Sequence, residues 1–128
     1  MTENAFDGKV SPMVKVSVIL KRKPGMSLEE FRRYWREVHG PLLLKQSALM
    51  RHVRKYVQCH SIADALPNTP GLSPQFDGIA ELWGDSVDSV KRGFAEPAYL
   101  EVIRPDEEKF LDLPNCVYMV TEEVIIRP

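Results

Sequence analysis

Three aromatic or imidazole side chains are spaced to share one face of a helix. Phe31, Trp35 and His39 stand at positions i, i+4 and i+8, and a helix turns once in about 3.6 residues, so the three side chains form one stripe. His39 directly precedes Gly40 and Pro41, where we expect the helix to stop. An imidazole titrates near neutral pH, so at the end of this stripe it could take up and return a proton. The simpler interpretation is a histidine that caps the last carbonyl groups of the helix.

Two predicted strands add polar and aromatic side chains to this candidate site. Residues 51–60 and 76–83 both alternate in character along the chain. Side chains two residues apart in a strand point to the same face of a sheet. We expect the more apolar set of each strand to pack under the helices, and the polar set to face away, where it is either solvated or lines a pocket formed with a partner. The polar sets include Arg54, Tyr56, His60, Asp77, Glu81 and Trp83.

These side chains together favour proton transfer without a cofactor. His39 would move a proton at a carbon next to a carbonyl group, and Asp77 or Glu81 would orient the imidazole or share the proton. Tyr56 and His60 would donate hydrogen bonds to the developing enolate oxygen. Each also has a structural interpretation, as pocket wall, turn residue or exposed strand end. The predicted catalytic residues are His39, Tyr56, His60 and Asp77, and the predicted substrate-binding residues are Trp35, Arg54, Glu81 and Trp83.

The elements that would position these residues follow an α+β order. Ser27 and Glu30 have the spacing of a capping box, which opens the helix that carries His39. Alternation predicts further strands at residues 14–20 and 116–126, and helical segments at 42–50, 85–94 and 98–111. This order predicts a ferredoxin-like βαβ-βαβ fold, with a four-stranded antiparallel sheet and the helices on one face. We see no internal repeat residue by residue.

A chain of 128 residues is expected to fold as one domain. Residues 1–12 show no periodicity and are expected to form a flexible N-terminal tail, which leaves 13–128 as the single domain. Residues 61–75 contain three prolines and are expected to form a long surface loop that could act as a lid.

The charge and composition exclude several classes of partner. Lys and Arg total 17 against 18 Asp and Glu, and no stretch is strongly basic, so we expect no binding to nucleic acid. No apolar run approaches the roughly 20 residues of a membrane span, and no signal peptide is recognisable, which predicts a cytoplasmic protein without a membrane partner. Cys59 and Cys116 lack metal-ligand spacing, and no cofactor motif is present, so we expect neither a metal nor a cofactor.

Three segments of the chain resemble the EthD family. Residues 20–42 (LKRKPGMSLEEFRRYWREVHGPL), 76–86 (FDGIAELWGDS) and 105–110 (PDEEKF) are similar to motifs of that family, in the same order. The resemblance implies a dimeric α/β barrel, in which two ferredoxin-like protomers place their open sheet faces together. Each protomer of this homodimer would enclose a largely apolar pocket beneath its helices and loops. The sequence departs from the family pattern at Gly84, where an aromatic residue commonly follows Trp83, and in the length of the 61–75 loop.

The resemblance leaves two classes of function open. We expect a small cofactor-independent enzyme of lyase or isomerase type, which decarboxylates, cyclises or isomerises a hydrophobic cyclic or aromatic carbonyl compound in a catabolic or secondary-metabolite pathway. Relatives in the wider superfamily include monooxygenases, a weaker alternative. The other class is a non-catalytic accessory protein of an oxygenase system, of the ether-degradation type, which binds a hydrophobic ligand or haem. His39 or His60 could then ligate the haem iron.

Overall fold

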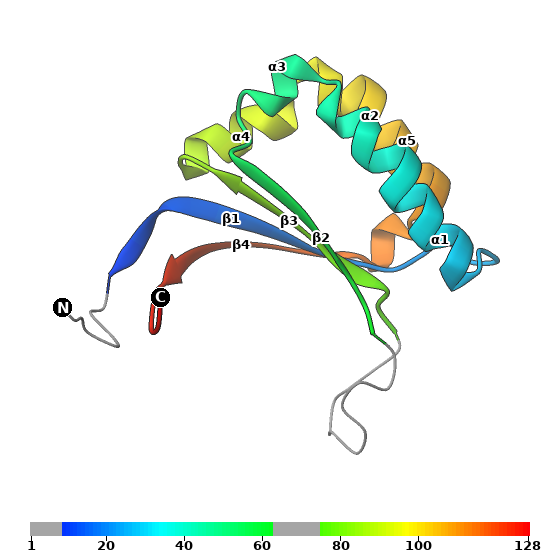
Figure 1. Cartoon of the computed structure of the whole chain (residues 1–128). Coiled ribbons are helices and arrows are strands. Elements are labelled where there is room, and N and C mark those ends of the chain that lie inside the picture. The colour runs from blue at the N-terminus through cyan, green and yellow to red at the C-terminus, as the bar shows by residue number, and fades with distance from the viewer. Residues whose placement is uncertain (1–8, 63–74) are drawn as a thin grey trace.

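The computed structural model describes residues 9–62 and 75–128. Its four strands are β1 (Val10–Leu20), β2 (Lys55–His60), β3 (Gly78–Gly84) and β4 (Val117–Val124). They form one sheet in the order β2-β3-β1-β4, and each neighbouring pair is antiparallel. The helices cover one face of this sheet (Figure 1). The predicted ferredoxin-like α+β fold is therefore confirmed.

Two helical arms link the strands. The first arm consists of α1 (Leu28–Tyr34), the π-helical turn η1 (Trp35–His39) and α2 (Gly40–Leu44), and the short helix α3 (Ser47–Met50) follows it. The second arm consists of α4 (Val87–Ala95), the π-helical turn η2 (Tyr99–Ile103) and α5 (Arg104–Phe110). A 3-10 turn, η3 (Leu113–Asn115), then leads into β4. Both arms lie above the same face of the sheet (Figure 1).

The first arm begins as predicted but does not end where we expected. The Ser27 hydroxyl accepts from the Glu30 backbone N–H, and the Glu30 carboxylate accepts from the Ser27 N–H, each at 3.0 Å, which completes the capping box. Gly40 and Pro41, however, continue the helix. The Gly40 N–H donates to the carbonyl of Trp35, five residues earlier. This wider turn accommodates Pro41, which lacks an N–H and whose ring crowds the turn before it in a regular α-helix.

The second arm repeats this device. The Arg104 N–H donates to the Tyr99 carbonyl, again five residues earlier, and Pro105 follows. The two arms thus share the pattern aromatic-x-Glu-Val-x-x-Pro, an internal repeat that the sequence analysis did not recognise. The matched residues are Trp35 and Tyr99, Glu37 and Glu101, Val38 and Val102, and Pro41 and Pro105.

The register of the sheet corrects the predicted faces of β2. Tyr56 pairs with Leu82, Gln58 with Ala80 and His60 with Gly78. Directly paired residues point to the same face, and Ala80 belongs to the core under the arms. Tyr56, Gln58 and His60 therefore also lie under the arms, and the prediction that they face away is wrong. Polar side chains are accommodated there because Gln58 Nε2 donates to the Trp35 carbonyl at 2.9 Å.

The core lies between the arms and the sheet. It combines Val16, Val18 and Leu20 of β1 with Phe31, Trp35 and Phe110 of the arms, and all six are at most 7% exposed. The ring centroid of Phe31 is 5.5 Å from that of Trp35 and 5.7 Å from that of Phe110. Two members of the Phe31, Trp35 and His39 stripe therefore hold the first arm against the core.

The expected N-terminal tail and the expected lid lie largely outside the described residues. β1 begins at Val10, which pairs with Val124 of β4, so this strand includes the last residues of the expected tail 1–12. Residues 1–8 of the expected tail and 63–74 of the expected lid lie outside the described residues. Within the described ranges, no helix is long and apolar enough to cross a bilayer.

Candidate active site

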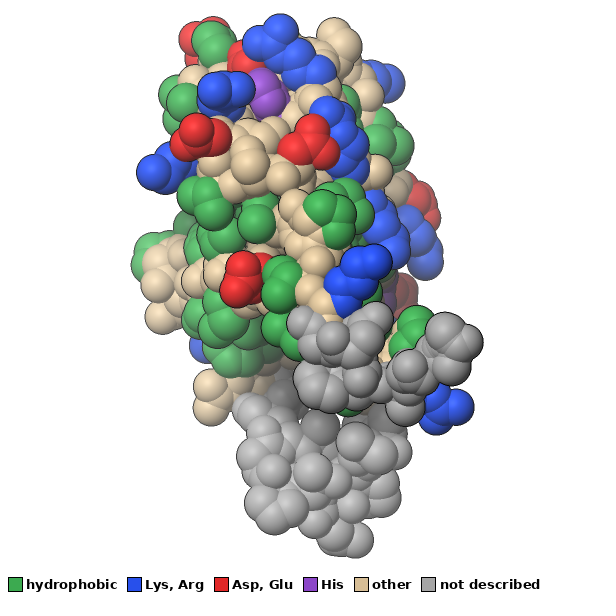
Figure 2. All heavy atoms as spheres, turned by 90° about the vertical axis from the view of Figure 1, so that its left-hand side faces the viewer, with side chains coloured by type: hydrophobic (Ala, Val, Ile, Leu, Met, Phe, Trp, Pro, Cys, Tyr) green, Lys and Arg blue, Asp and Glu red, His purple; other side chains and the backbone are tan. Residues whose placement is uncertain are grey.

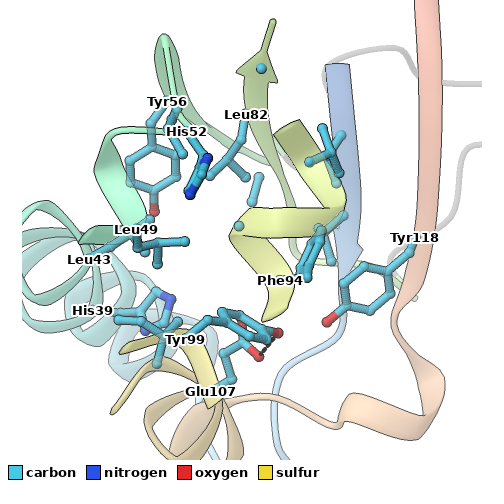
Figure 3. A pocket seen from close by; sticks show the side chains of 18 of the residues that line it. His39, Leu43, Leu49, His52, Tyr56, Leu82, Phe94, Tyr99, Glu107 and Tyr118 are labelled. Carbon is cyan, nitrogen blue, oxygen red and sulfur yellow. Dashed lines mark hydrogen bonds between the residues drawn. The ribbon is translucent and has the colours of Figure 1, made fainter. Parts of the chain in front are cut away.

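A cavity lies between the sheet and the two arms (Figure 3). Its volume is about 100 Å³, several times the roughly 10–15 Å³ that one buried water molecule needs. Most of its lining is apolar, as is usual for a site that binds a small organic molecule. The polar side chains of the lining are His39, His52, Tyr56, Ser89, Tyr99, Glu107 and Tyr118.

His39 is buried in the wall of this cavity, with 5% of its surface exposed. Its Nδ1 lies 2.8 Å from Oδ2 of Asp106, and its ring packs on Phe110 with centroids 4.9 Å apart. Burial lowers the pKa of His39 below its usual value, although the Asp106 carboxylate acts in the opposite direction. The neutral ring must carry its proton on Nδ1 to donate to Asp106, which leaves the lone pair on Nε2. Within the described chain Nε2 has no hydrogen-bond partner, and Figure 3 shows the imidazole turned into the cavity.

Asp106, on the second arm, fixes the orientation of this imidazole. It is 4% exposed and also accepts a hydrogen bond from the Tyr34 hydroxyl at 2.5 Å. The sequence predicts Asp77 or Glu81 in this role, but Glu81 pairs with Lys15 and neither carboxylate contacts the imidazole. Asp77 accepts from the backbone N–H of Arg22 at 2.9 Å and from Arg22 Nη1 at 3.1 Å, so it joins the end of β1 to the start of β3 and does not line the cavity.

Glu107 brings a second carboxyl group to the cavity. Its Oε1 accepts from the Tyr99 hydroxyl at 2.9 Å and lies 3.4 Å from Nε of Arg104. Burial raises the pKa of Glu107 to about 7, although Tyr99 and Arg104 both act to lower it. Burial likewise raises the pKa of Tyr118, across the cavity on β4, to about 12. Glu107, Asp106 and Tyr99 are not among the site residues predicted from the sequence, although the first two lie in the EthD-like segment 105–110.

Tyr56 of β2 contributes a hydroxyl group to the same space (Figure 3). The hydroxyl accepts from Gln58 Nε2 at 2.8 Å. Burial raises the pKa of Tyr56, so the phenol stays neutral at physiological pH. Because no acceptor for its own proton is found in the part of the chain that the structure describes, this hydroxyl is available to donate to the oxygen of a ligand.

The structure places two further predicted residues away from the cavity. The His60 ring packs on Trp35, with centroids 4.4 Å apart, and its Nε2 lies 3.0 Å from Oε1 of Gln58. Arg54 makes two bonds to the Asp85 carboxylate, at 3.0 and 2.7 Å, on the surface. Neither residue lines the cavity, so the roles expected for them there are not supported. Trp35, by contrast, forms part of the cavity wall.

Glu81 and the indole of Trp83 lie on the opposite face of the sheet. Lys15 and Lys55 both pair with Trp83, so the three side chains share that face. The Trp83 indole N–H donates to Oε1 of Glu123 at 2.8 Å, while Lys15 Nζ lies 2.9 Å from Oε2 of Glu81. Although Trp83 borders the cavity, its ring is directed away from it. Glu81 does not line the cavity beneath the arms, so a substrate contact of Glu81 is not supported there, and the contact of Trp83 stays a prediction.

The cavity approaches the surface where α4 meets the edge strand β4. A shallow hollow there is lined by Val87, Phe94 and Val120, and Figure 2 shows hydrophobic side chains gathered among charged ones on the side of the molecule that includes this region. Phe94 lines both the hollow and the cavity, and its ring lies 5.1 Å from that of Tyr99 and 6.4 Å from that of Tyr118, centroid to centroid. Phe94 thus stands between the cavity and solvent.

Within the residues that the structure describes, no three His, Cys, Asp or Glu side chains gather in a group that could hold a metal ion. The ionisable side chains that line the cavity carry imidazole, carboxyl and phenol groups.

Comparison with known proteins identifies the family of this chain. The sequence is 29% identical over 111 residues to a protein named dehydratase ustZ from Ustilaginoidea virens. This match covers 77% of this chain and 75% of that protein. It is 29% identical over 121 residues to the conidial pigment biosynthesis dehydratase EthD of Metarhizium robertsii, covering 84% of this chain and 83% of the relative. A solved structure from Bacteroides fragilis, described as a dimeric protein of unknown function with a ferredoxin-like fold, superposes with a TM-score of 0.64 at 16% identity, over 90% of this chain and 100% of that one. The sequence profile of the EthD domain matches residues 23–114, and the chain therefore belongs to the EthD family.

Proposed function

We propose that this protein is a cofactor-independent lyase that removes water from a hydrophobic cyclic or aromatic carbonyl compound. The observation that carries the proposal is the 2.8 Å contact between His39 Nδ1 and Asp106, which leaves Nε2 as a free base in an apolar cavity. Two relatives named dehydratases, one of them in pigment biosynthesis, support the reaction class and a place in secondary metabolism.

Residues in and next to the cavity can supply the base, the oxyanion donor and the orienting carboxylate of an elimination. His39 Nε2 would take a proton from the carbon next to the carbonyl group of the substrate. Tyr56 would donate a hydrogen bond to the carbonyl oxygen as it becomes an enolate. Asp106 would stabilise the imidazolium that forms, as a carboxylate does when it orients a histidine base. The hydroxyl group on the next carbon would then leave as water.

A matched pair of histidine variants tests this assignment. The probes are β-hydroxy ketones of increasing ring number, beginning with the adduct of acetone and para-nitrobenzaldehyde, whose conjugated enone product is followed by absorbance. We expect His39→Gln to lower kcat by at least about 10²-fold, the usual contribution of a positioned general base. His60→Gln, which alters a histidine outside the cavity, should leave kcat within a few-fold of wild type.

Two results would overturn the proposal. One is full activity in His39→Gln. The other is tight binding of the enones without turnover of any β-hydroxy ketone, which would favour the ligand-binding accessory protein. A Soret band after addition of haem would favour the haem-binding form of that alternative.

We also propose that the protein forms a homodimer through the open face of its sheet. Figure 1 shows the arms on one face and no described helix on the other. On that open face, Met119 of the edge strand β4 pairs with Ser17 and is 54% exposed. An exposed apolar strand surface of this kind is typical of an interface. The dimeric Bacteroides fragilis structure of similar fold supports the proposal.

Light scattering after size exclusion tests the dimer. We expect a mass twice that of the 14.6 kDa chain. Met119→Glu should shift the protein to monomer, whereas Val87→Glu, on the helical side and 50% exposed, should not. A monomeric wild-type protein would contradict the proposal.

A further inference from the structure

We infer that Glu107 is the acid of the elimination and gives its proton to the hydroxyl group that leaves. The inference rests on the proposed function, because an acid is needed only if a poor leaving group departs. It concerns a different step from the one assigned to His39.

The position of Glu107 separates it from the base. Glu107 follows Asp106 directly on α5, and consecutive residues of a helix point about 100° apart. Asp106 is therefore turned toward His39 of the first arm. Glu107 is turned toward Tyr99 of the second arm, as Figure 3 shows. Both His39 and Glu107 line the same cavity. A substrate between them could present a carbon-bound proton to the imidazole and a hydroxyl group to the carboxyl.

The hydrogen bonds of Glu107 leave one oxygen free for a proton. Tyr99 and Arg104 both approach Oε1, at 2.9 and 3.4 Å. Oε2 has no hydrogen-bond partner in the described parts of the chain, although the side chain is only 13% exposed. A carboxyl group with one oxygen held by donors and the other open to an apolar cavity is arranged to carry its proton on the open oxygen.

The charges around Glu107 allow it to hold that proton near neutral pH. The titratable groups that interact with it are Tyr99 and Arg104 of the second arm, Asp106 on its own helix, Tyr118 of β4, Tyr56 of β2 and Cys116. Arg104 is half exposed, so water weakens its pull on the carboxylate. Burial and Asp106 raise the pKa of Glu107, and the result, about 7, lies where a general acid is most effective.

The proton and electron balance of the step closes without another reactant. His39 Nε2 takes the proton from carbon, and the electron pair of that C–H bond passes through the enolate to form the carbon–carbon double bond. The C–O bond breaks with its electron pair on oxygen, and Glu107 Oε2 supplies a proton to that oxygen, so water leaves. The imidazolium and the carboxylate that remain are restored when the proton passes from His39 to Glu107 through water.

The leaving group of the probe distinguishes this role from a structural one. With the β-hydroxy ketone made from acetone and para-nitrobenzaldehyde, we expect Glu107→Gln to lower kcat/KM by about 10²-fold or more. The acetate ester of the same compound loses acetate, which needs no proton, so Glu107→Gln should process it within a few-fold of wild type. His39→Gln should fail with both compounds. Glu108→Gln, an exposed neighbour on the same helix, is the control and should behave as wild type with both.

The outcomes separate this inference from the proposed function. If His39→Gln fails with both compounds while Glu107→Gln retains full activity with the alcohol, the dehydratase stands and the acid role is overturned. Equal losses of Glu107→Gln with alcohol and ester would also overturn it, because they indicate a structural defect.

A second measurement does not depend on turnover. In protein with carboxyl-labelled glutamate, the carbon signal absent from Glu107→Gln should titrate near pH 7 and shift when the enone product is added. A midpoint near the ordinary value of 4.5, or no response to the enone, would contradict the inference.

Discussion

The first arm, residues 28–44, and the second arm, residues 87–110, pass through the same kind of π-helical turn and carry different chemistry. In each arm the first carbonyl of the turn, that of Trp35 or Tyr99, accepts from the N–H five residues later. At the last position of the turn the first arm has His39 and the second has Ile103. Since only the first turn ends in an ionisable group, the π-helical turn by itself does not indicate catalysis. The turn lets each helix continue past a proline above the cavity, and the chemistry depends on which side chains the turn and the following helix carry.

The difference continues along the arms. Asp106 and Glu107 of the second arm correspond, in the repeat, to Leu42 and Leu43 of the first. The base thus comes from one arm and the carboxyl groups from the other, and the direct contact between His39 and Asp106 joins the two arms. Two arms with the same backbone pattern but different side chains can therefore form a His–Asp dyad to which each arm contributes one residue.

The largest expected effect comes from breaking the contact between the arms. We expect Asp106→Asn to lower kcat by roughly 10²–10⁴-fold, since the amide no longer selects the imidazole tautomer with its lone pair on Nε2. Tyr34→Phe removes only the second donor to Asp106 and should cost less than about 10-fold. Steady-state kinetics on the β-hydroxy ketones measures both, and equal losses in the two variants would argue against a specific role for the carboxylate.

The aromatic residues that open the two turns should differ in their contribution to stability. Trp35 is 1% exposed, and we expect Trp35→Ala to lower the free energy of unfolding by about 3–5 kcal/mol. Tyr99→Phe keeps the ring and removes only the hydroxyl that bonds to Glu107, so it should cost about 1 kcal/mol. Urea denaturation compares the two, and a loss below 1 kcal/mol for Trp35→Ala would contradict the packing argument.

Two glycines, Gly78 in β3 beneath the first arm and Gly93 in α4 of the second arm, differ in how much space surrounds them. A Cβ at Gly78, beneath the first arm, would lie 2.7 Å from the Trp35 ring and 2.7 Å from the Cys59 carbonyl oxygen. We expect Gly78→Ala to cost about 1–3 kcal/mol of stability. A Cβ at Gly93, in the second arm, would meet His52 and Leu49 at 3.6 and 3.7 Å, which is ordinary contact. Gly93→Ala should therefore be neutral or add up to about 1 kcal/mol, because alanine favours a helix. Similar denaturation midpoints for the two variants would contradict this prediction, because they would show that the Trp35 ring and the strands around Gly78 shift to make room for the added methyl group at little cost.

Local signals in the sequence predicted much of the fold. The capping box at Ser27 and Glu30, the order of the elements and the faces of β3 depend on neighbouring residues, and the structure has them as expected. The helix end at Gly40 and Pro41 was predicted wrongly, because a π-helical turn lets a proline continue the helix and leaves no clear mark in one sequence. The faces of β2 were reversed because Gln58 bonds to a carbonyl of the first arm, a contact between residues far apart in the chain.

The site was harder to predict than the fold for the same reason. The helical stripe placed His39 at the end of one face, but its partner Asp106 is 67 residues away in the chain. Residues 106–108 have the sequence Asp-Glu-Glu, which looks like the solvated face of a helix. Only the approach of the arms shows that Asp106 and Glu107 are turned inward while Glu108 stays exposed.

The smallest expected effect is the dependence of stability on pH, because Glu107 of the second arm and His39 of the first arm contribute with opposite signs. The pKa of Glu107 is raised from 4.5 to about 7, so the unfolded chain holds fewer protons between these values and stability falls as pH rises. The pKa of buried His39 is lowered from 6.5, so the unfolded chain holds more protons just below 6.5 and stability rises with pH there. Each group alone would change the free energy of unfolding by up to about 1.4 kcal/mol per pH unit within its window.

We therefore expect the urea midpoint of the wild-type protein to vary less with pH just below 6.5 than the midpoint of either single variant, because the two contributions oppose each other there. Glu107→Gln removes the falling contribution and should leave a midpoint that rises with pH, whereas His39→Gln should leave one that falls. Glu108→Gln, which changes an exposed carboxyl, should follow the wild type. If Glu107→Gln and His39→Gln show the same slope of urea midpoint against pH, the two groups do not affect stability in opposite directions. That result would contradict the assignment of the acid to the second arm and the base to the first.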